Sequence, residues 1–321
     1  MHRKGKKIII SVIVPTHNRA DIVVMCLKSL RSQSLPADLF EVIVSDDGSD
    51  NDIQPRIQNF LDDSSFNCVY LRQEKAGANP ARNNAIKHSR GEILLLINDD
   101  ILASAKMLEE HFNTHKKYPA ESDAVLGKVT IHPSIKDSFF TALHLDASFD
   151  LWEGRKILDW KAFYTCNISV KKSFLDKYGY FDTGLNWHED LELSERLSHH
   201  NLRVIYNPDA LGYHYHNLDE TQFLNIAEKE GKALAIWHKK SPHLKKTLAS
   251  IGFYPGLPFY NRIKYIFADI IMNKYSISLF IPLARSLQGK HPHQATALYR
   301  KIFQSIKRES IRDELQKKNC K

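Results

Sequence analysis

The chain has 321 residues, of which 43% are hydrophobic and 26% are charged. These values are close to the average for globular proteins and exclude collagen-like, disordered and disulfide-scaffold proteins, and a chain of this length forms one large domain or two modest ones. Lysine and arginine outnumber aspartate and glutamate by 45 to 37, which favours anionic partners such as phosphorylated small molecules or acidic lipid surfaces. Because net charge is the only feature that suggests nucleic acid, we expect no nucleic-acid partner.

The cysteines and the N-terminus bear on where the protein resides. The four cysteines form no CxxC pair and are Cys26, Cys68, Cys166 and Cys320. This scatter is typical of reduced thiols in the cytosol. The segment MHRKGKKIII contains no secretion cleavage site, and the longest apolar runs are shorter than the roughly 18–20 residues that span a bilayer. We therefore expect a cytoplasmic protein, with peripheral attachment to the cytoplasmic face of the membrane left open.

The first hundred residues alternate between predicted strands and helices. The β-branched run from Ile8 to Val14 predicts a buried strand, and apolar residues at helical spacing from Ile22 to Leu30 predict a helix after it. Further strands are predicted at 40–45, 66–71 and 92–97. Asn79 is the expected N-cap of a helix between the last two strands. This alternation predicts an α/β fold with an open, mostly parallel sheet flanked by helices.

Beyond Asp123 the pattern is mixed. We expect strands at 124–131 and 164–170, a helix at 188–200, and short strands within 202–216. An amphipathic helix is predicted at 220–240, and aromatic, aliphatic and basic residues are mixed through Lys290. These changes predict one α/β domain over residues 1–218 and a C-terminal helical region over residues 219–321.

Three polar clusters directly follow predicted strands: PTHNR at 15–19, DDGSD at 46–50 and NDD at 98–100. Because ligands of open α/β sheets bind outside the carboxyl ends of the strands, we expect these clusters to converge on one crevice. Asp99 and Asp100 would repel each other unless a divalent cation lies between them and a polyphosphate. A solvated turn or a helix N-cap is the alternative for this pair, and a simple Asp-Gly turn is the alternative for the 46–50 cluster.

Five segments resemble, in this order and spacing, the family 2 glycosyltransferases of the GT-A fold: SVIVPTHNR, VIVSDDGSD, GANPARNNAI, LLLINDDI and WHEDLELSERL. The resemblance covers roughly Ile8 to His216. It implies a GT-A, Rossmann-like sheet and a metal-dependent, inverting enzyme that takes a sugar from a nucleotide-diphosphate donor. Residues 219–321 would then contact the acceptor, a membrane surface or a second copy of the chain.

The resemblance also implies the residues that bind the nucleotide, which are Pro15, Thr16, Asn18, Arg19, Asp46, Arg82 and Asp99. The loop after the first strand and Asp46 would hold the base, usually uracil, with the Asp46 carboxylate accepting from a base N–H. Arg82 would support the nucleotide or its phosphates. Asp99 would approach the ribose and the metal.

A metal site for Mn²⁺ or Mg²⁺ is implied around the NDD cluster. Asp100 would bind the ion directly, with Asp99 beside it, and Asn98 stands where many members of the family have a first aspartate. His214 and His216 are two residues apart on a predicted strand, so their rings share one face. Imidazole suits manganese-like ions, and the resemblance implies that one of the two histidines completes the metal shell. We favour His216; packed or surface histidines are the alternative.

The HED triplet supplies the catalytic candidate. The resemblance implies that Asp190 is the general base, and its neighbour Glu189 should raise its pKa because two close carboxylates resist double ionisation. An acidic first turn, favoured by the helix dipole, would explain one of the two carboxylates instead. Trp187 and Glu189 are candidates for the acceptor or sugar site, although a tryptophan in the core is the simpler alternative for Trp187.

We therefore expect an inverting glycosyltransferase that moves a sugar from a UDP-sugar to a hydroxyl of a glycan or lipid-linked glycan, in surface polysaccharide biosynthesis. A nucleotidyltransferase is less favoured because no glycine-rich loop follows the first strand. A non-catalytic, glycosyltransferase-like glycan-binding module is the second alternative. The sequence leaves open the sugar, the acceptor and whether the chain forms a homo-oligomer.

Overall fold

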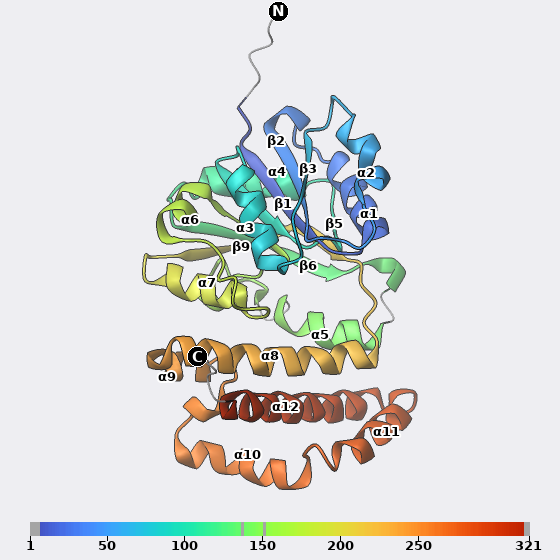
Figure 1. Ribbon diagram of the computed structural model, residues 1–321, viewed down its shortest axis with the longest axis vertical. Coiled ribbons are helices and arrows are strands. Elements are labelled where there is room, and N and C mark those ends of the chain that lie inside the picture. The colour runs from blue at the N-terminus through green and yellow to red at the C-terminus, as the bar shows by residue number, and fades with distance from the viewer. Residues whose placement is uncertain (1–6, 136–137, 150–151, 318–321) are drawn as a thin grey trace, which may run out of the picture. The chain divides into compact units, whose positions relative to one another are not determined.

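The structure, a computed structural model, describes residues 7–135, 138–149 and 152–317. It divides into two compact units, the first containing residues 1–184 and 189–217 and the second containing residues 185–188 and 218–321. Figure 1 shows the sheet and helices of the first unit and the helices of the second. The described cysteines, Cys26, Cys68 and Cys166, are free thiols, and Cys320 lies outside the described residues.

The first unit is built on one mixed sheet that has nine strands within the described residues. The strands are β1 (Ile10–Thr16), β2 (Phe40–Asp46), β3 (Cys68–Arg72), β4 (Ile93–Ile97), β5 (Ile101–Ala103), β6 (Asp123–Ile131), β7 (Ile157–Leu158), β8 (Asn167–Lys171) and β9 (Arg203–His214). Their order is β3-β2-β1-β4-β8-β6-β9-β5, and β7 pairs with β9 outside this path. Strands β1 to β4 pair in parallel, while β8 is antiparallel to β4 and β6. This confirms the predicted α/β fold with a mixed, mostly parallel sheet.

The helices of the first unit are α1 (Ala20–Arg31), α2 (Gln54–Leu61), α3 (Ala78–His88), α4 (Met107–Lys117), α5 (Phe139–Phe149), α6 (Lys172–Tyr178) and α7 (Glu189–Ser198). In α1 the residues at helical spacing, Val23, Cys26, Leu27 and Leu30, are the buried ones. Strands β1, β2 and β4 are buried along their whole length. The apolar runs of the sequence therefore form the core that fixes the strand ends in place.

Two local predictions were wrong. Asn79 does not cap α3, because Gly77 occupies the position before the helix with a φ of 107°. Asp47, at the end of β2, accepts hydrogen bonds from the N–H groups of Ala76 and Gly77 at 2.9 and 2.7 Å, so a distant carboxylate serves the start of this helix. In addition, residues predicted as short strands form the single long strand β9, whose pairing with β6 is irregular near Gly127.

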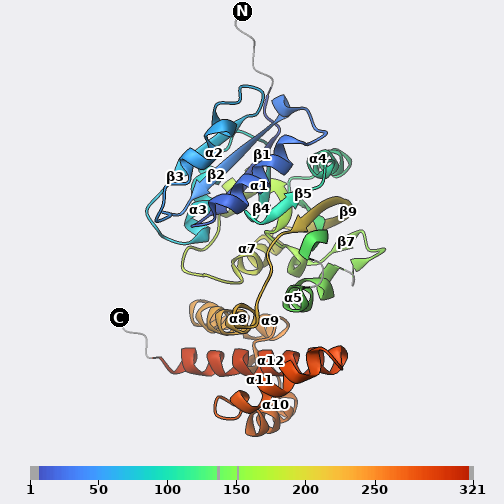
Figure 2. The same cartoon turned by 90° about the vertical axis from the view of Figure 1, so that its right-hand side faces the viewer.

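The second unit is helical. Its helices are α8 (Glu220–Lys240), α9 (Lys245–Ala249), α10 (Phe259–Ile271), α11 (Ile277–Gln288) and α12 (Pro292–Gln316). Helices α8 and α12 lie side by side (Figures 1 and 2), and a Cβ at Gly231 would lie 2.4 Å from the Lys307 carbonyl oxygen, so glycine permits the close approach. No helix within the described ranges combines the length and the hydropathy needed to cross a bilayer.

Candidate active site

The loops after β1 and β2 are tied together. The register of these parallel strands pairs Thr16 with Asp46 at their carboxyl ends. Asn18, which has a φ of 57°, donates from Nδ2 to Asp50 at 2.7 Å and accepts from the Asp50 N–H at 2.7 Å. Its own N–H donates to Ser49 Oγ. These bonds fix the polar segment after β1 against the segment after β2.

The Asp46 carboxyl is fully buried and already hydrogen-bonded. Its Oδ1 accepts from the N–H and hydroxyl of Ser49 at 3.0 and 2.5 Å. Its Oδ2 accepts from the Tyr70 hydroxyl at 2.7 Å, and burial and the Asp46 carboxylate raise the pKa of Tyr70 to above its usual range. The side chain is 0% exposed, and Arg72 Nε lies 4.0 Å from the same Oδ2, so groups of the protein itself surround this carboxylate.

Asp99 and Asp100 follow β4, and a single arginine bonds to both. Arg19 donates from Nη1 to Asp99 Oδ1 at 2.7 Å and from Nη2 to Asp100 Oδ2 at 3.0 Å. Thr16 Oγ1 donates to the other Asp99 oxygen at 2.7 Å. Thr16 thus lies next to Asp46 in the sheet and bonds to Asp99, so the ends of β1, β2 and β4 share one site.

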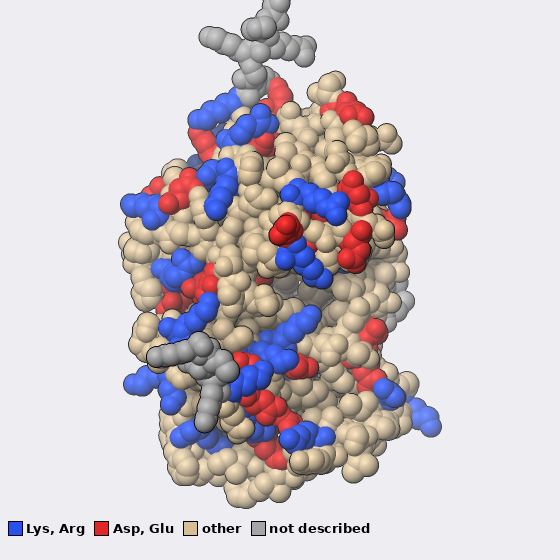
Figure 3. All heavy atoms as spheres, viewed as in Figure 1, with Lys and Arg blue, Asp and Glu red and all other residues tan. Residues whose placement is uncertain are grey.

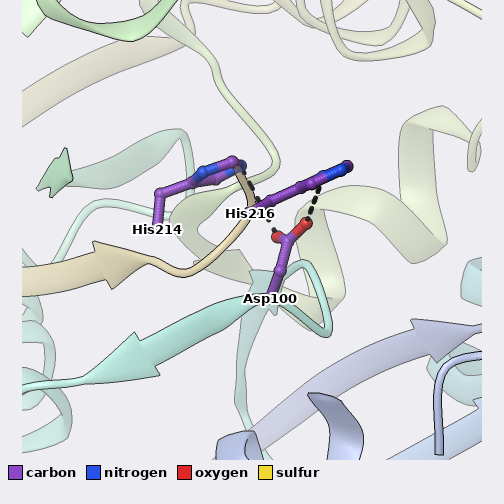
Figure 4. A group of neighbouring side chains, drawn as sticks. All are labelled: Asp100, His214 and His216. Carbon is purple, nitrogen blue, oxygen red and sulfur yellow. Dashed lines mark ion pairs between the residues drawn. The ribbon is translucent and has the colours of Figure 1, made fainter. Parts of the chain in front are cut away.

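Asp100, His214 and His216 form a group that could hold a metal ion (Figure 4). One ligand atom from each lies within 4.8 Å of the others. His214 Nε2 is 3.8 Å from Asp100 Oδ1, and His216 Nδ1 is 3.5 Å from Asp100 Oδ2. The sequence pattern left the choice between the two histidines open, and the fold brings both to the same carboxylate.

Two buried atoms in this group have no hydrogen-bond partner among the described residues: Asp100 Oδ1 and His214 Nδ1. An unpartnered carboxylate oxygen at the edge of a buried strand is costly unless a cation or donor completes it. One carboxylate and two imidazoles are also a suitable donor set for a manganese-like ion. The residues therefore fit a divalent cation. Asp99, whose oxygens accept from Thr16 and Arg19, is not part of this group of three.

The charges in the site shift the pKa values of the two aspartates in opposite directions. Burial and the neighbouring Asp100 charge raise the pKa of Asp99 to about 6. Burial acts on Asp100 as well, but contact with His216, His214 and Arg19 outweighs it and holds the pKa of Asp100 below its usual range. Burial lowers the pKa of His214, which favours the neutral imidazole that a metal ion requires.

Arg82 joins the end of β4 to the start of α7. Its Nη2 donates to Asn98 Oδ1 at 3.1 Å, and its Nη1 donates to Glu189 Oε1 at 2.7 Å. Nη1 also reaches Asn79 Oδ1 at 3.0 Å, and the guanidinium lies over the Phe181 ring. Arg82 and Glu189 are 107 positions apart in the chain. Arg82 is therefore a positioning residue, and Glu189 is its ion-pair partner.

Asp190 lies in the first turn of α7. Its Oδ1 accepts from the Leu191 N–H at 2.8 Å. Desolvation, reinforced by the Glu189 charge, raises the pKa of Asp190 to about 7. Burial, reinforced by the charges of Asp190 and Asp100, raises the pKa of the Cys166 thiol to about 12. A carboxyl that is half ionised near neutral pH is suited to accept a proton.

Pro15 and Trp187 complete the candidates. Pro15 is buried in β1, directly before Thr16 and opposite Ser45, and its side chain carries no polar atom. Trp187 belongs to the second unit, where the Lys229 ammonium lies 5.7 Å from the centre of its ring.

The residues that hold the candidate side chains in place were not among those predicted from the sequence. Ser49 and Tyr70 hold Asp46, and Asp47 bonds the segment before α3 through Ala76 and Gly77. Ser49 lies within the DDGSD segment, where short polar side chains commonly bond nearby backbone groups, and could have been found. Tyr70 sits inside β3 and carries no local signal, because only strand pairing brings it to Asp46.

Comparison with known proteins points to glycosyltransferases. Residues 11–168 match the family described as glycosyl transferase family 2. The chain is 28% identical over 253 residues to the uncharacterized glycosyltransferase YfnE of Bacillus subtilis (strain 168), in an alignment that covers 64% of each chain. It therefore spans just under two thirds of the length of YfnE.

Two solved structures share the fold. The mannosyltransferase PcManGT from Pyrobaculum calidifontis, in complex with GDP-Man and Mn²⁺, matches with a TM-score of 0.64 at 18% identity, covering 96% of this chain and 87% of PcManGT. TarS 1-349 of S. aureus, in complex with UDP, matches with a TM-score of 0.56 at 18% identity, covering 95% of this chain and 92% of that one. The fold and the family match agree: the segment 11–168 is that of a family 2 glycosyltransferase, and the chain has the GT-A fold.

Proposed function

We propose that the chain is a metal-dependent, inverting glycosyltransferase that moves a sugar from a nucleotide-diphosphate donor, a UDP-sugar, to a hydroxyl of a glycan or lipid-linked glycan. The observation that carries the proposal is the Arg82 bridge, which ties Asn98 beside the aspartate pair to Glu189 beside Asp190. It supports a single site in which one set of carboxylates binds the donor and another receives a proton.

The nucleotide end of the donor suits the crevice after β1 and β2. Asp46, held by Ser49 and Tyr70 at the end of β2, is our candidate to accept from a base N–H such as that of uracil. Thr16, Asn18 and Arg19 line the same side. The relatives do not decide the base, since TarS holds UDP and PcManGT holds GDP-Man.

Asp100, His214 and His216 are the residues that would bind Mn²⁺ or Mg²⁺. A divalent cation there would offset the negative charge that develops on the departing diphosphate. Arg19 bonds both aspartates, so its guanidinium neutralises part of the acidic cluster and orients Asp99 toward the donor side. Thr16 fixes the other Asp99 oxygen.

Asp190 acts as the general base. In its ionised form it removes the proton from the acceptor hydroxyl while that oxygen bonds to the anomeric carbon of the sugar and the bond to the diphosphate breaks. Attack on the face opposite the leaving group inverts the anomeric centre. A pKa near 7 leaves about half of Asp190 ionised at neutral pH while keeping it basic enough to accept a proton. Trp187 is our candidate for stacking on an acceptor sugar.

The test is a panel of UDP- and GDP-sugars, each with and without Mn²⁺, measured by thermal shift and by release of the nucleoside diphosphate. We expect one donor to raise the Tm only when Mn²⁺ is present, because a ligand that binds only the native state stabilises it. Asp100→Asn should weaken Mn²⁺-dependent donor binding by at least about tenfold, since even groups that only orient metal ligands contribute about 10–100-fold.

Asp209→Asn is the matched control, because Asp209 is an exposed carboxylate of β9 and should leave binding unchanged. Donor binding without any nucleotide release, with every acceptor tried, would favour a non-catalytic glycan-binding module. Release of pyrophosphate from a nucleoside triphosphate and a sugar phosphate would instead favour a nucleotidyltransferase. Donor binding that Mn²⁺ does not change would contradict the metal assignment.

A further inference from the structure

The second unit exposes an apolar surface that glycosyl transfer does not explain. Eleven large hydrophobic residues are exposed in the described chain, and ten of them lie on α10, α11 and the link between them. These ten residues, which we call the apolar face, are Phe259, Tyr260, Ile263, Ile266, Phe267, Ile270, Ile271, Tyr275, Leu279 and Leu283. The eleventh is Ile157 of β7. Such a concentration on one surface marks an interaction site.

Helix α10 differs from an ordinary surface helix, because its apolar side faces outward instead of toward the core. At 3.6 residues per turn, its seven exposed apolar side chains fall within an arc of about 140°, and Phe267 is 63% exposed. In the view of Figure 3, the edge that α10 forms in Figure 1 shows almost only uncharged residues. No residue of α10 is buried. Folding of the chain alone therefore does not account for these side chains.

The polar side of α10 is the side that packs against α12. Asp269 accepts from Arg308 Nε at 2.7 Å and is also paired with Arg312. The Arg308 guanidinium lies 5.3 Å from the centre of the Tyr265 ring. These contacts fix the rotation of the helix and hold its apolar arc outward, so the exposure is built into the fold.

The charges around the apolar face select the kind of partner. Residues 259–290 contain five basic side chains, Arg262, Lys264, Lys274, Arg285 and Lys290, and one acidic side chain, Asp269. Two arginines of α12 neutralise that acid, while Arg285 pairs with Glu220 and Lys274 lies 4.0 Å from Glu309. Arg262, Lys264 and Lys290 therefore add positive charge beside the apolar rings. Tyr260 and Tyr275 lie near the two ends of α10, and tyrosine suits the level of lipid headgroups.

We infer that the apolar face of α10 and α11 docks on an anionic lipid bilayer. The helices would lie in the plane of the interface, with the Phe and Ile side chains among the acyl chains and Lys264 and Lys274, both exposed, among the headgroup phosphates. A second copy of the chain is less favoured, since a symmetric contact through this face would bring together two surfaces with the same excess of basic residues. The inference does not depend on the proposed reaction.

The test is sedimentation of the full chain with vesicles of phosphatidylglycerol and phosphatidylcholine in equal parts, and with phosphatidylcholine alone. We expect binding to the anionic vesicles that weakens at 0.5 M salt. Phe267→Glu with Ile270→Glu should lower the partition coefficient at least about tenfold, because burying either side chain is strongly favourable. Ile157→Glu, which changes the exposed isoleucine outside the apolar face, is the matched control and should bind as the unchanged protein does.

A second pair of variants tests the charges. Lys264→Gln with Lys274→Gln should lower binding to anionic vesicles by about fivefold for each residue removed, whereas Lys28→Gln on α1 should have no effect. All these residues are exposed, so an unchanged Tm will show that the variants fold. Absence of binding by the unchanged protein, or binding that survives Phe267→Glu with Ile270→Glu, would overturn the inference. A dimer in solution that this double variant dissociates, with no binding to vesicles, would assign the face to a second copy instead.

Neither nucleotide sugar nor metal is needed for the vesicle measurement. A chain that binds vesicles but turns over no donor would contradict the proposed function and support the membrane surface. A chain that transfers sugar but ignores vesicles would do the reverse.

Discussion

The two units depart in opposite ways from the rule that apolar side chains lie inside and polar ones outside. In the first unit, Asp46, Asp99 and Asp100 are buried at the ends of strands. In the second unit, aromatic and aliphatic side chains of α10 and α11 are exposed. Burying a carboxylate and exposing a phenylalanine both cost stability. Each departure therefore marks a region whose residues we expect to serve binding or catalysis rather than stability.

The comparison also shows how each departure is kept in place. Buried carboxylates are held by fixed donors, such as Thr16 and Arg19 around Asp99. Exposed apolar side chains are held outward by ion pairs on the opposite side of the helix, as Asp269 shows with Arg308. The first device prepares a site for a small charged ligand, and the second prepares a broad surface.

The largest effect expected in the first unit comes from Asp190→Asn. It should lower nucleotide release from the donor by roughly 10²- to 10⁴-fold, because a neutral amide cannot accept the proton of the attacking hydroxyl. Binding of UDP and Mn²⁺ should persist in calorimetry. Asp209→Asn makes the same chemical change on an exposed carboxylate and should keep full activity. Retained turnover in Asp190→Asn would contradict the assignment of Asp190 as the general base.

A pair of phenylalanines tests whether the second unit separates folding from docking. Phe253→Ala should lower the free energy of unfolding by about 3–5 kcal/mol, because Phe253 is 0% exposed and its removal leaves a cavity. Phe267→Ala should change it by no more than about 0.5 kcal/mol, because this side chain is exposed. Chemical denaturation measures both. A large loss from Phe267→Ala would mean that the apolar face belongs to the core of the unit.

The smallest effect concerns the pH dependence of turnover. Activity needs ionised Asp190, so the rate should fall below about pH 7, where this group becomes protonated. Glu189→Gln removes the neighbouring negative charge that raises the pKa of Asp190, so the acidic limb of the profile should move to lower pH. Glu195→Gln, on the same helix but paired with His199, should leave the limb in place. If the acidic limb of the pH profile does not move in Glu189→Gln, the limb reports the ionisation of a group other than Asp190.

Local patterns were sufficient for the elements but not for their caps and partners. The run at 40–45 predicted β2 and the spacing at 220–240 predicted α8, because burial on a regular element repeats with the period of that element. Asn79 was a plausible cap on local grounds, yet Gly77 and the distant Asp47 occupy that role. A cap supplied from another strand has no signature in the neighbouring sequence.

The candidate site was predictable where its residues follow strands and unpredictable where they meet across the fold. The NDD cluster at 98–100 and the HED triplet stand out in the sequence, and the resemblance to family 2 glycosyltransferases suggested their roles. The Arg82–Glu189 ion pair and the Tyr70–Asp46 hydrogen bond could not be read in this way. Each contact joins elements that are separated in the sequence and that only the fold brings together.

The amino-acid sequence by itself determined that the chain would fold as alternating strands and helices with carboxylates at the strand ends, because the periods of burial and the residues that interrupt them are local properties. Only the tertiary structure decided that Asp100 meets both histidines, that Arg82 joins two acidic clusters, and that α10 turns its apolar arc outward. Those outcomes depend on strand order and helix rotation, which are set by the packing of the whole chain rather than by any one segment.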